Sequence, residues 1–158
     1  MVIFNKIIVW CTFYACTLIA VSAGFVFPLG NNSEFFTSLN EPMFAPPNWI
    51  FGPIWTILYI LIATSAYRIT QQTHKYIPIV IALWTLQIAL NIIWVPIFAG
   101  AENLEVAFYY IIALWISIIF YILASWKVDK WASIMFIPYF VWISFASVLN
   151  YSYWQLNI

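Results

Sequence analysis

The side chains of this sequence that could do chemistry are mainly aromatic rings and amides. Trp55 and Tyr59 are four residues apart, so they share one face of a helix. Gln87, Asn91 and Trp94 follow at spacings of four and three, and they also share a face. In an apolar environment such polar groups usually point into a helix bundle, where they bind either a ligand or a neighbouring helix. These groups suit a flat, largely apolar ligand with a few polar points.

Other kinds of catalytic site find little support in the sequence. His74 is the only histidine, and no cluster of His, Cys, Asp and Glu has the spacing of a metal site. A Ser-His-Asp set and a glycine-rich phosphate loop are also missing from the sequence. Cys11 and Cys16 form no Cys-x-x-Cys pair, and we expect them to be packing residues. We therefore expect no metal site and no required cofactor.

The composition of the chain indicates a membrane protein. Hydrophobic residues make up 66% of it and charged residues only 6%, whereas a soluble domain has about 25% charged residues. The length of 158 residues suits a single domain over residues 1–158. The net charge is zero, so the chain offers no basic surface for nucleic acid.

Five apolar stretches are long enough to cross a bilayer. They cover residues 7–27, 49–69, 76–98, 104–126 and 133–153. The sequence therefore predicts an all-α fold, an integral membrane bundle of five transmembrane helices. Residues 21–23 (Val-Ser-Ala) resemble a signal-peptidase site, so a cleaved signal peptide is the alternative for the first stretch.

The interval between the first and second stretches, residues 28–48, is long and polar, which is typical of a functional loop or a lid. The prolines within residues 42–47 restrict the angle at which the chain enters the second helix. We expect Asn48 to be the N-cap of that helix. Pro53 is expected either to occupy the first helical position or to kink a helix that began at Trp49.

The charged residues divide between the two sides of the membrane. The basic side holds Lys6, Arg68, Lys75, Lys127 and Lys130. The acidic side holds Glu34, Glu41, Glu102 and Glu105. Because Lys and Arg normally lie on the cytoplasmic side, we expect the N-terminus inside and the long loop and the C-terminus outside.

Three ordered motifs, within residues 42–59, 89–100 and 138–151, resemble those of the TspO/MBR family. These are the tryptophan-rich sensory proteins of bacteria and the translocator protein of mitochondria, and the likeness covers roughly residues 27–154. The resemblance implies a five-helix membrane bundle, commonly a homodimer, that binds tetrapyrroles and, in some members, sterols and synthetic aromatic ligands. It also favours a bacterial cell membrane as the location. Several bacterial members are associated with light-dependent breakdown of protoporphyrin.

The resemblance places Trp55 and Trp142 in a pocket between helices. Two indoles can hold a flat macrocycle by offset stacking, and an excited porphyrin beside either one could take an electron from it. We therefore expect these two residues to be catalytic if the protein degrades its ligand; bundle packing is the alternative role for both. The expected ligand-binding residues are Trp55, Tyr59, Gln87, Asn91, Trp94, Tyr110, Trp142, Ala146 and Leu149. Of these, Tyr110 stands where the family often has an acidic residue.

Two functions of different kinds remain open at this point. The first is binding of a porphyrin, either protoporphyrin IX or haem, with light-dependent degradation. The second is transport or sensing of tetrapyrroles, sterols or lipids with no chemical turnover. A sterol-recognition pattern of the family needs a Lys or Arg after Tyr151, where this chain has Gln155, so sterol binding through that pattern is disfavoured. A structural membrane adaptor without saturable ligand binding is a third interpretation.

Overall fold

The computed structural model describes residues 11–20 and 34–158, and this part of the chain contains helices and no strands. The predicted all-α class is therefore confirmed. In order, the elements are the helix Cys11–Ala20, α2 (Glu34–Ser38), a 3₁₀ turn (Asn48–Ile50), α3 (Phe51–Thr70), α4 (Ile77–Val95), a π-helical turn (Pro96–Gly100), α5 (Leu104–Ser125) and α6 (Lys130–Leu156).

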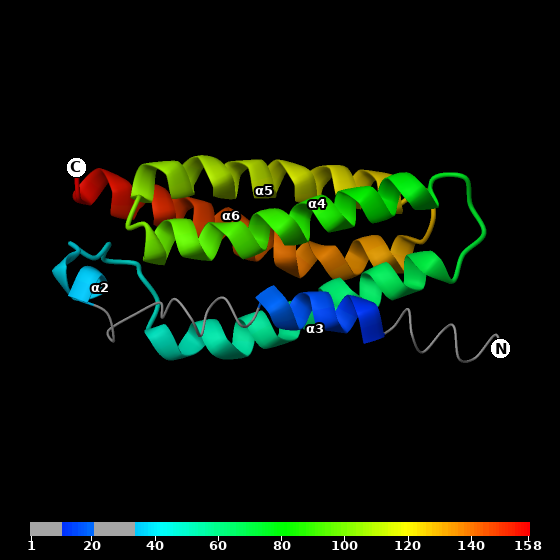
Figure 1. Cartoon of the computed structure of the whole chain (residues 1–158), viewed down its shortest axis with the longest axis horizontal. Helices are drawn as coiled ribbons and strands as arrows, with labels where there is room; N and C mark the ends of the chain where they lie inside the picture. Colours follow the sequence, from blue (N-terminus) through cyan, green and yellow to red (C-terminus); the bar gives the residue numbers. More distant parts are fainter. Residues whose placement is uncertain (1–10, 21–33) are drawn as a thin grey trace.

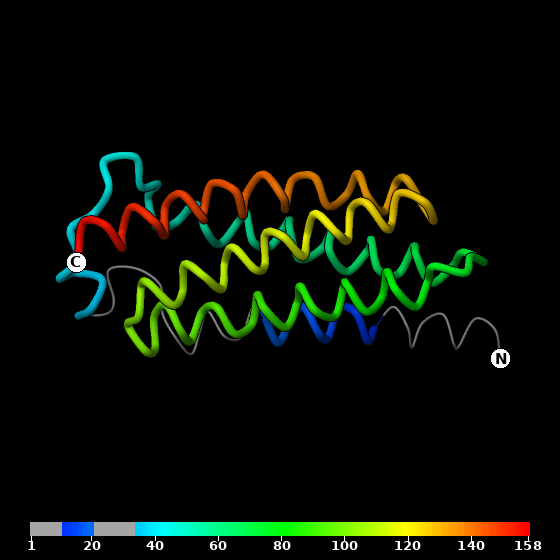
Figure 2. The backbone as a smooth tube through the Cα atoms, turned by 90° about the horizontal axis from the view of Figure 1, so that it is seen from above, coloured from blue at the N-terminus to red at the C-terminus, as the bar shows by residue number. Residues whose placement is uncertain are grey.

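The long helices run side by side along the length of the molecule (Figures 1 and 2). The neighbouring pairs are α5 with α6, α4 with α5, and α3 with α6. The helix Cys11–Ala20 lies against α3 and α4, because the Tyr14 hydroxyl is 2.8 Å from Thr64 Oγ1 and the ring of Phe13 meets Trp84 edge-on at 4.8 Å. Helix α2 lies at the same end of the bundle as the last turn of α6 (Figure 1).

Four of the helices are long and apolar enough to cross a membrane: α3 with its 3₁₀ turn, α4 with its π-helical turn, α5 and α6. They expose large apolar side chains, such as Ile57, Phe120 and Val141, as expected for surfaces that face lipid. The chain is an integral membrane protein. Of the first predicted span, residues 7–27, the structure describes Cys11–Ala20; the remainder, including the Val-Ser-Ala sequence, lies outside the described residues.

The start of the second span differs from the prediction. Asn48 is not a helix N-cap; it is the first residue of the 3₁₀ turn, and no side chain caps that turn. Pro47 precedes it in an extended conformation (φ −54°, ψ 139°), so the helical conformation begins one residue earlier than expected. The 3₁₀ turn continues directly into α3, which places Pro53 in the first turn of a helix already begun, where its missing N–H is tolerated.

Helix α6 extends three residues beyond the predicted span of residues 133–153 at each end, and a polar residue accounts for its earlier start. Asp129 is the N-cap, and its Oδ1 accepts hydrogen bonds from the backbone N–H groups of Trp131 (2.9 Å) and Ala132 (3.4 Å). The same carboxylate forms a 2.9 Å salt bridge with Arg68 near the end of α3, and only 6% of the Asp129 side chain is exposed. This cap therefore also joins α3 to α6 at the basic end of the bundle.

We expect Asp129→Ala to lower the free energy of unfolding by about 1–3 kcal/mol, because it removes both the cap and a hydrogen-bonded charge. Asp129→Asn should have a smaller effect, since an amide oxygen still caps the helix. Thermal unfolding in detergent, followed by the helical circular dichroism signal, measures both variants. Equal melting temperatures for Asp129→Ala and the parent protein would contradict this account of the cap.

Candidate functional site

An apolar cavity of about 30 Å³ lies inside the bundle, and we call it the inner chamber. Side chains from all four long helices line it: Phe51, Trp55, Asn91, Trp94, Ile111, Leu114, Trp142, Ile143 and Ala146. The lining contains five of the predicted site residues. The single side-chain amide in this set is that of Asn91, so the inner chamber suits an apolar ligand with few polar points.

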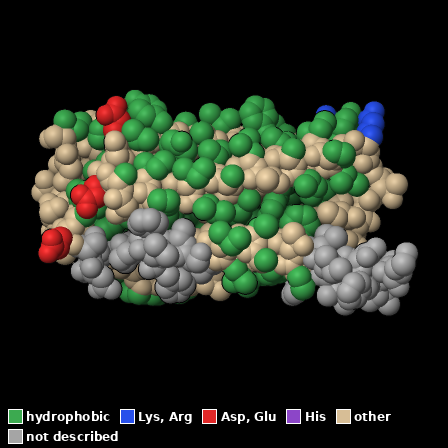
Figure 3. Space-filling model, in the orientation of Figure 1, with side chains coloured by type: hydrophobic (Ala, Val, Ile, Leu, Met, Phe, Trp, Pro, Cys, Tyr) green, Lys and Arg blue, Asp and Glu red, His purple; other side chains and the backbone are tan. Residues whose placement is uncertain are grey.

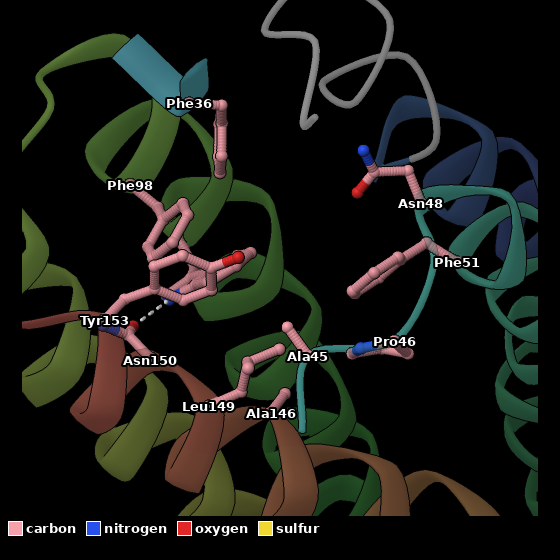
Figure 4. A pocket seen from close by; sticks show the side chains of 11 residues that line it. Phe36, Ala45, Pro46, Asn48, Phe51, Phe98, Ala146, Leu149, Asn150 and Tyr153 are labelled. Carbon is pink, nitrogen blue, oxygen red and sulfur yellow. Dashed lines mark hydrogen bonds between the residues drawn. The ribbon is translucent and has the colours of Figure 1, made fainter. Parts of the chain in front are cut away.

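A second cavity of about 60 Å³, the outer chamber, lies toward the end of the bundle that carries α2. Its lining residues are Phe36, Ala45, Pro46, Asn48, Phe51, Trp94, Phe98, Ala146, Leu149, Asn150 and Tyr153. Figure 4 shows Phe36, Phe98 and Tyr153 on one side of this cavity and Pro46, Asn48 and Phe51 on the other. The two chambers share Phe51, Trp94 and Ala146, so these three side chains form the partition between them.

The two tryptophans that we expected in the pocket both border the inner chamber. Trp55 of α3 stacks on Tyr59, with ring centroids 5.1 Å apart and planes 26° apart, as their four-residue spacing predicts. Trp142 of α6 meets Phe51 edge-on at 5.6 Å. The indole Nε1 of Trp142 is buried and has no hydrogen-bond partner within the described part of the chain. Trp142 therefore keeps an indole donor that no described residue engages.

Asn91 connects three helices beside the inner chamber. Its Oδ1 accepts a 2.9 Å hydrogen bond from the hydroxyl of Tyr59 on α3. Its Nδ2 donates a 3.1 Å hydrogen bond to the hydroxyl oxygen of Tyr139 on α6. The helix-to-helix role that we weighed for this amide is thus realised, and Asn91 also lines the cavity.

Trp94 is held in place by a residue that the sequence-based site did not include. Its Nε1 donates a 3.1 Å hydrogen bond to Asn150 Oδ1, drawn as a dashed line in Figure 4. Asn150 Nδ2 in turn donates to the carbonyl oxygen of Leu104, at 3.0 Å. The ring of Trp94 also stacks on Phe98 at 4.8 Å. These contacts fix the orientation of the indole in the partition.

Sequence reasoning also missed Phe51 and Tyr153 as lining residues. A signal was present for both, because Phe51 is four residues before Trp55 and Tyr153 is four residues after Leu149, so each pair shares a helix face. The predicted aromatic face on α3 contains only Trp55 and Tyr59.

Three predicted ligand-binding residues line neither chamber. Tyr59 is buried beneath the stacked ring of Trp55, and its hydroxyl donates a hydrogen bond to Asn91. Gln87 is fully buried one turn from Asn91, and neither its Nε2 nor its Oε1 has a hydrogen-bond partner among residues 11–20 and 34–158. Tyr110 is half-buried on α5. Their direct role in ligand binding stays a prediction.

Both chambers are small for an organic ligand. Pockets for drug-sized molecules have volumes of about 300–1,000 Å³, against about 60 and 30 Å³ here. A larger ligand therefore requires the aromatic side chains of the partition to separate. The described residues contain no group of three His, Cys, Asp or Glu that could hold a metal ion. His74 lies in the link between α3 and α4, where its Nδ1 accepts from the backbone N–H of Tyr76 at 3.2 Å.

We expect Asn91→Leu to destabilise the bundle by about 1–3 kcal/mol, because it leaves the buried Tyr59 hydroxyl without its acceptor. Adding Tyr59→Phe and Tyr139→Phe should restore part of the lost stability, since both hydroxyls that bonded to Asn91 are then removed as well. Unfolding in detergent, with the single and triple variants side by side, tests the point. A triple variant less stable than Asn91→Leu would show that the hydroxyls have other roles.

Comparison with known proteins identifies the family of this chain. Residues 13–155 match the sequence profile of the TspO/MBR family. Protein CrtK of Rhodobacter capsulatus is 36% identical over 147 residues, which cover 92% of this chain and 89% of CrtK. Tryptophan-rich protein TspO of Chlorobaculum tepidum is 36% identical, with 85% and 87% covered, and the translocator protein of Ovis aries is 30% identical, with 94% and 91% covered. The chain belongs to the TspO/MBR family.

Proposed function

We propose that this protein binds a porphyrin-type tetrapyrrole, protoporphyrin IX or haem, in the space between α3, α4, α5 and α6. The observation that carries the proposal is that Trp55 and Trp142 reach the same apolar chamber from different helices. Offset stacking on indole rings suits a flat macrocycle. Asn91 and the Trp142 Nε1, which has no partner among the described residues, supply polar points. The macrocycle is a ligand, and the protein itself requires no cofactor.

We extend the proposal to light-dependent degradation of the bound porphyrin, with Trp55 and Trp142 as the catalytic residues. On illumination the excited macrocycle takes one electron from an adjacent indole, so the porphyrin becomes a radical anion and the indole a radical cation. Dissolved dioxygen is the co-reactant: it takes this electron to become superoxide, which forms a C–O bond to the macrocycle, and the adduct returns one electron to the indole radical cation. The net reaction is addition of O2 to the porphyrin, with the indole restored. Exclusion of water by the apolar lining limits competing reactions at the two radicals.

Transport or sensing without turnover is the second candidate, and the outer chamber favours it. This chamber lies between the inner chamber and the loop at the end of the bundle, so a ligand released from the indoles has a place on its way out. Two relatives carry names that refer to sensing or translocation: tryptophan-rich sensory protein and translocator protein. Products that form only in the light distinguish degradation from this alternative.

Titration of the purified protein in detergent, first in the dark and then under illumination, tests the function. We expect saturable binding of protoporphyrin IX, and comparable binding of haem, because no described histidine lies in the bundle to bind the iron. Product analysis by mass spectrometry follows illumination. Absence of saturable binding by either porphyrin would refute the proposal, whereas binding without light-dependent products would leave only the second candidate.

We expect Trp55→Phe and Trp142→Phe to weaken porphyrin binding by only about 1 kcal/mol each, since phenylalanine keeps much of the stacking area. The rate of light-driven degradation should fall much further, because phenylalanine is far harder to oxidise than indole. Trp131→Phe is the matched control, because this tryptophan lies on α6 but is 64% exposed and lines neither chamber. Unchanged degradation in both pocket variants would exclude the proposed site.

The charge distribution supports an orientation in the membrane. Acidic side chains gather at one end of the molecule and basic side chains at the other (Figure 3). We propose that the basic end is cytoplasmic, with the chambers opening toward the outside of a bacterial cell membrane. We also propose a homodimer, and this part rests on family membership alone.

Cysteine labelling checks the orientation. In a background with Cys11→Ser and Cys16→Ser, we expect Ser38→Cys to react with a membrane-impermeant maleimide in intact cells. Thr73→Cys should react only after the cells are opened, because it lies in the basic link between α3 and α4. Labelling in the reverse order would show that the protein has the opposite orientation.

A further inference from the structure

Two lysines from different links of the chain meet at one aromatic ring at the basic end of the bundle. The Nζ atom of Lys75, in the link between α3 and α4, lies 5.1 Å from the ring centroid of Tyr76. The Nζ atom of Lys127, in the link between α5 and α6, lies 5.7 Å from the same centroid. Both lysines are exposed, and we call them the lysine pair. Because two like charges beside one ring repel each other, an anion between them is stabilising.

The protein supplies no carboxylate for this role within its described residues. The chain has five acidic residues, and its four glutamates belong to the acidic end. The fifth, Asp129, is already engaged: it forms a 2.9 Å salt bridge with Arg68, and its Oδ2 accepts a 3.3 Å hydrogen bond from Gln72 Nε2. Neither member of the lysine pair takes part in a salt bridge in the described part of the chain. The counter-ion of the pair therefore has to come from another molecule.

The backbone beside the lysine pair also favours an anion. Helix α4 begins directly after Tyr76, and no side chain caps its first turn. The partial positive charge of the N–H groups at the start of a helix therefore adds to the charge of the two ammonium groups. His74 fixes the position of Tyr76, since its Nδ1 accepts from the backbone N–H of Tyr76 at 3.2 Å and the two rings are 5.1 Å apart. This arrangement suits a phosphate group.

The surface next to the lysine pair is apolar and faces lipid. Helices α4 and α5 are neighbours, and each places an exposed aliphatic side chain four residues from one of the lysines. Ile79 follows Lys75 and is 56% exposed, and Leu123 precedes Lys127 and is 60% exposed. The indole of Trp126 is 48% exposed beside them, as is common at the level of the lipid headgroups. A phosphate carried on acyl chains matches both the charged and the apolar part of this surface.

We propose that the lysine pair binds the headgroup phosphate of an anionic phospholipid of the phosphatidylglycerol type, whose acyl chains lie along the exposed faces of α4 and α5. The bound lipid neutralises the pair and joins the α3–α4 link to the α5–α6 link. The site is at the opposite end of the bundle from the outer chamber. This inference is therefore independent of porphyrin binding, and either one can fail without the other.

Native mass spectrometry of the full-length protein in detergent tests the preference for an anionic lipid. Phosphatidylglycerol and phosphatidylcholine with the same acyl chains are titrated separately. We expect the anionic lipid to bind roughly tenfold more tightly or better, since each basic residue near an anionic lipid contributes about fivefold. The double variant Lys75→Gln, Lys127→Gln should lose most of this preference, whereas the double variant with arginine at both positions should keep it.

Lys130→Gln is the matched control. It removes a positive charge from the same end, but Lys130 lies 5.9 Å from the ring centroid of Trp126 and not beside Tyr76. It should keep the preference for phosphatidylglycerol. Equal binding of the two lipids by the parent protein would overturn the proposal, as would an equal loss of preference in the control and the double glutamine variant. Displacement of the lipid by glycerophosphoglycerol, the same headgroup without acyl chains, would show a site for free anions and would also overturn it.

A second measurement locates the acyl chains. In a background with Cys11→Ser and Cys16→Ser, a fluorophore is attached to Leu123→Cys on α5 or, as the control, to Ile134→Cys, which lies four residues after Lys130 on α6 and replaces a side chain that is 40% exposed. We expect phosphatidylglycerol with brominated chains to quench the label at position 123 more strongly than brominated phosphatidylcholine does. The two lipids should quench equally at position 134. Equal quenching by the two lipids at position 123 would contradict the proposed site.

Discussion

The hydrogen bonds of Asn91 hold together the part of the bundle on which the site depends. Helices in lipid gain little from hydrophobic association, so close packing and polar bonds between them determine how they fit. Asn91 accepts from Tyr59 on α3 and donates to Tyr139 on α6, from its own position on α4. Trp55 packs on both tyrosines, stacked on Tyr59 at 5.1 Å and edge-on to Tyr139 at 6.1 Å. The position of this indole in the inner chamber therefore follows from one buried amide.

The same aromatic side chains serve for packing and line the cavities. Phe51, Trp94 and Ala146 separate two chambers that together would be one larger pocket, and Trp142 packs on Phe51. The packing role of these rings therefore does not exclude the ligand-binding role proposed for them. A flat macrocycle can replace ring-to-ring contacts with contacts of the same kind, which lowers the cost of opening a close-packed interior.

The two ends of the molecule are stabilised differently. At the basic end, Asp129 caps α6 and pairs with Arg68, while Lys75 and Lys127 lie 5.1 and 5.7 Å from the ring centroid of Tyr76. At the acidic end, the segment from Phe36 to Pro46 borders the outer chamber, and its hydrogen bonds from Asn40 to Asn157 of α6 are exposed to water. Stability therefore decreases from the helices toward the loop.

The sequence alone was sufficient to predict the all-α class, the four long spans that the structure describes, and the shared face of Trp55 and Tyr59, because hydropathy and helical period are local properties. It also indicated the family through three short motifs.

Only the tertiary structure could show that Asn91 forms hydrogen bonds with two tyrosines, that Asn150 orients Trp94, and that the cavity is divided in two. It also corrected the role of Asn48, because the conformation at Pro47 decides where the helix begins. The hydrogen bond between Asn40 and Asn157 joins residues 117 positions apart. No local pattern specifies such a pair, since packing of the whole bundle decides which helix end meets the loop.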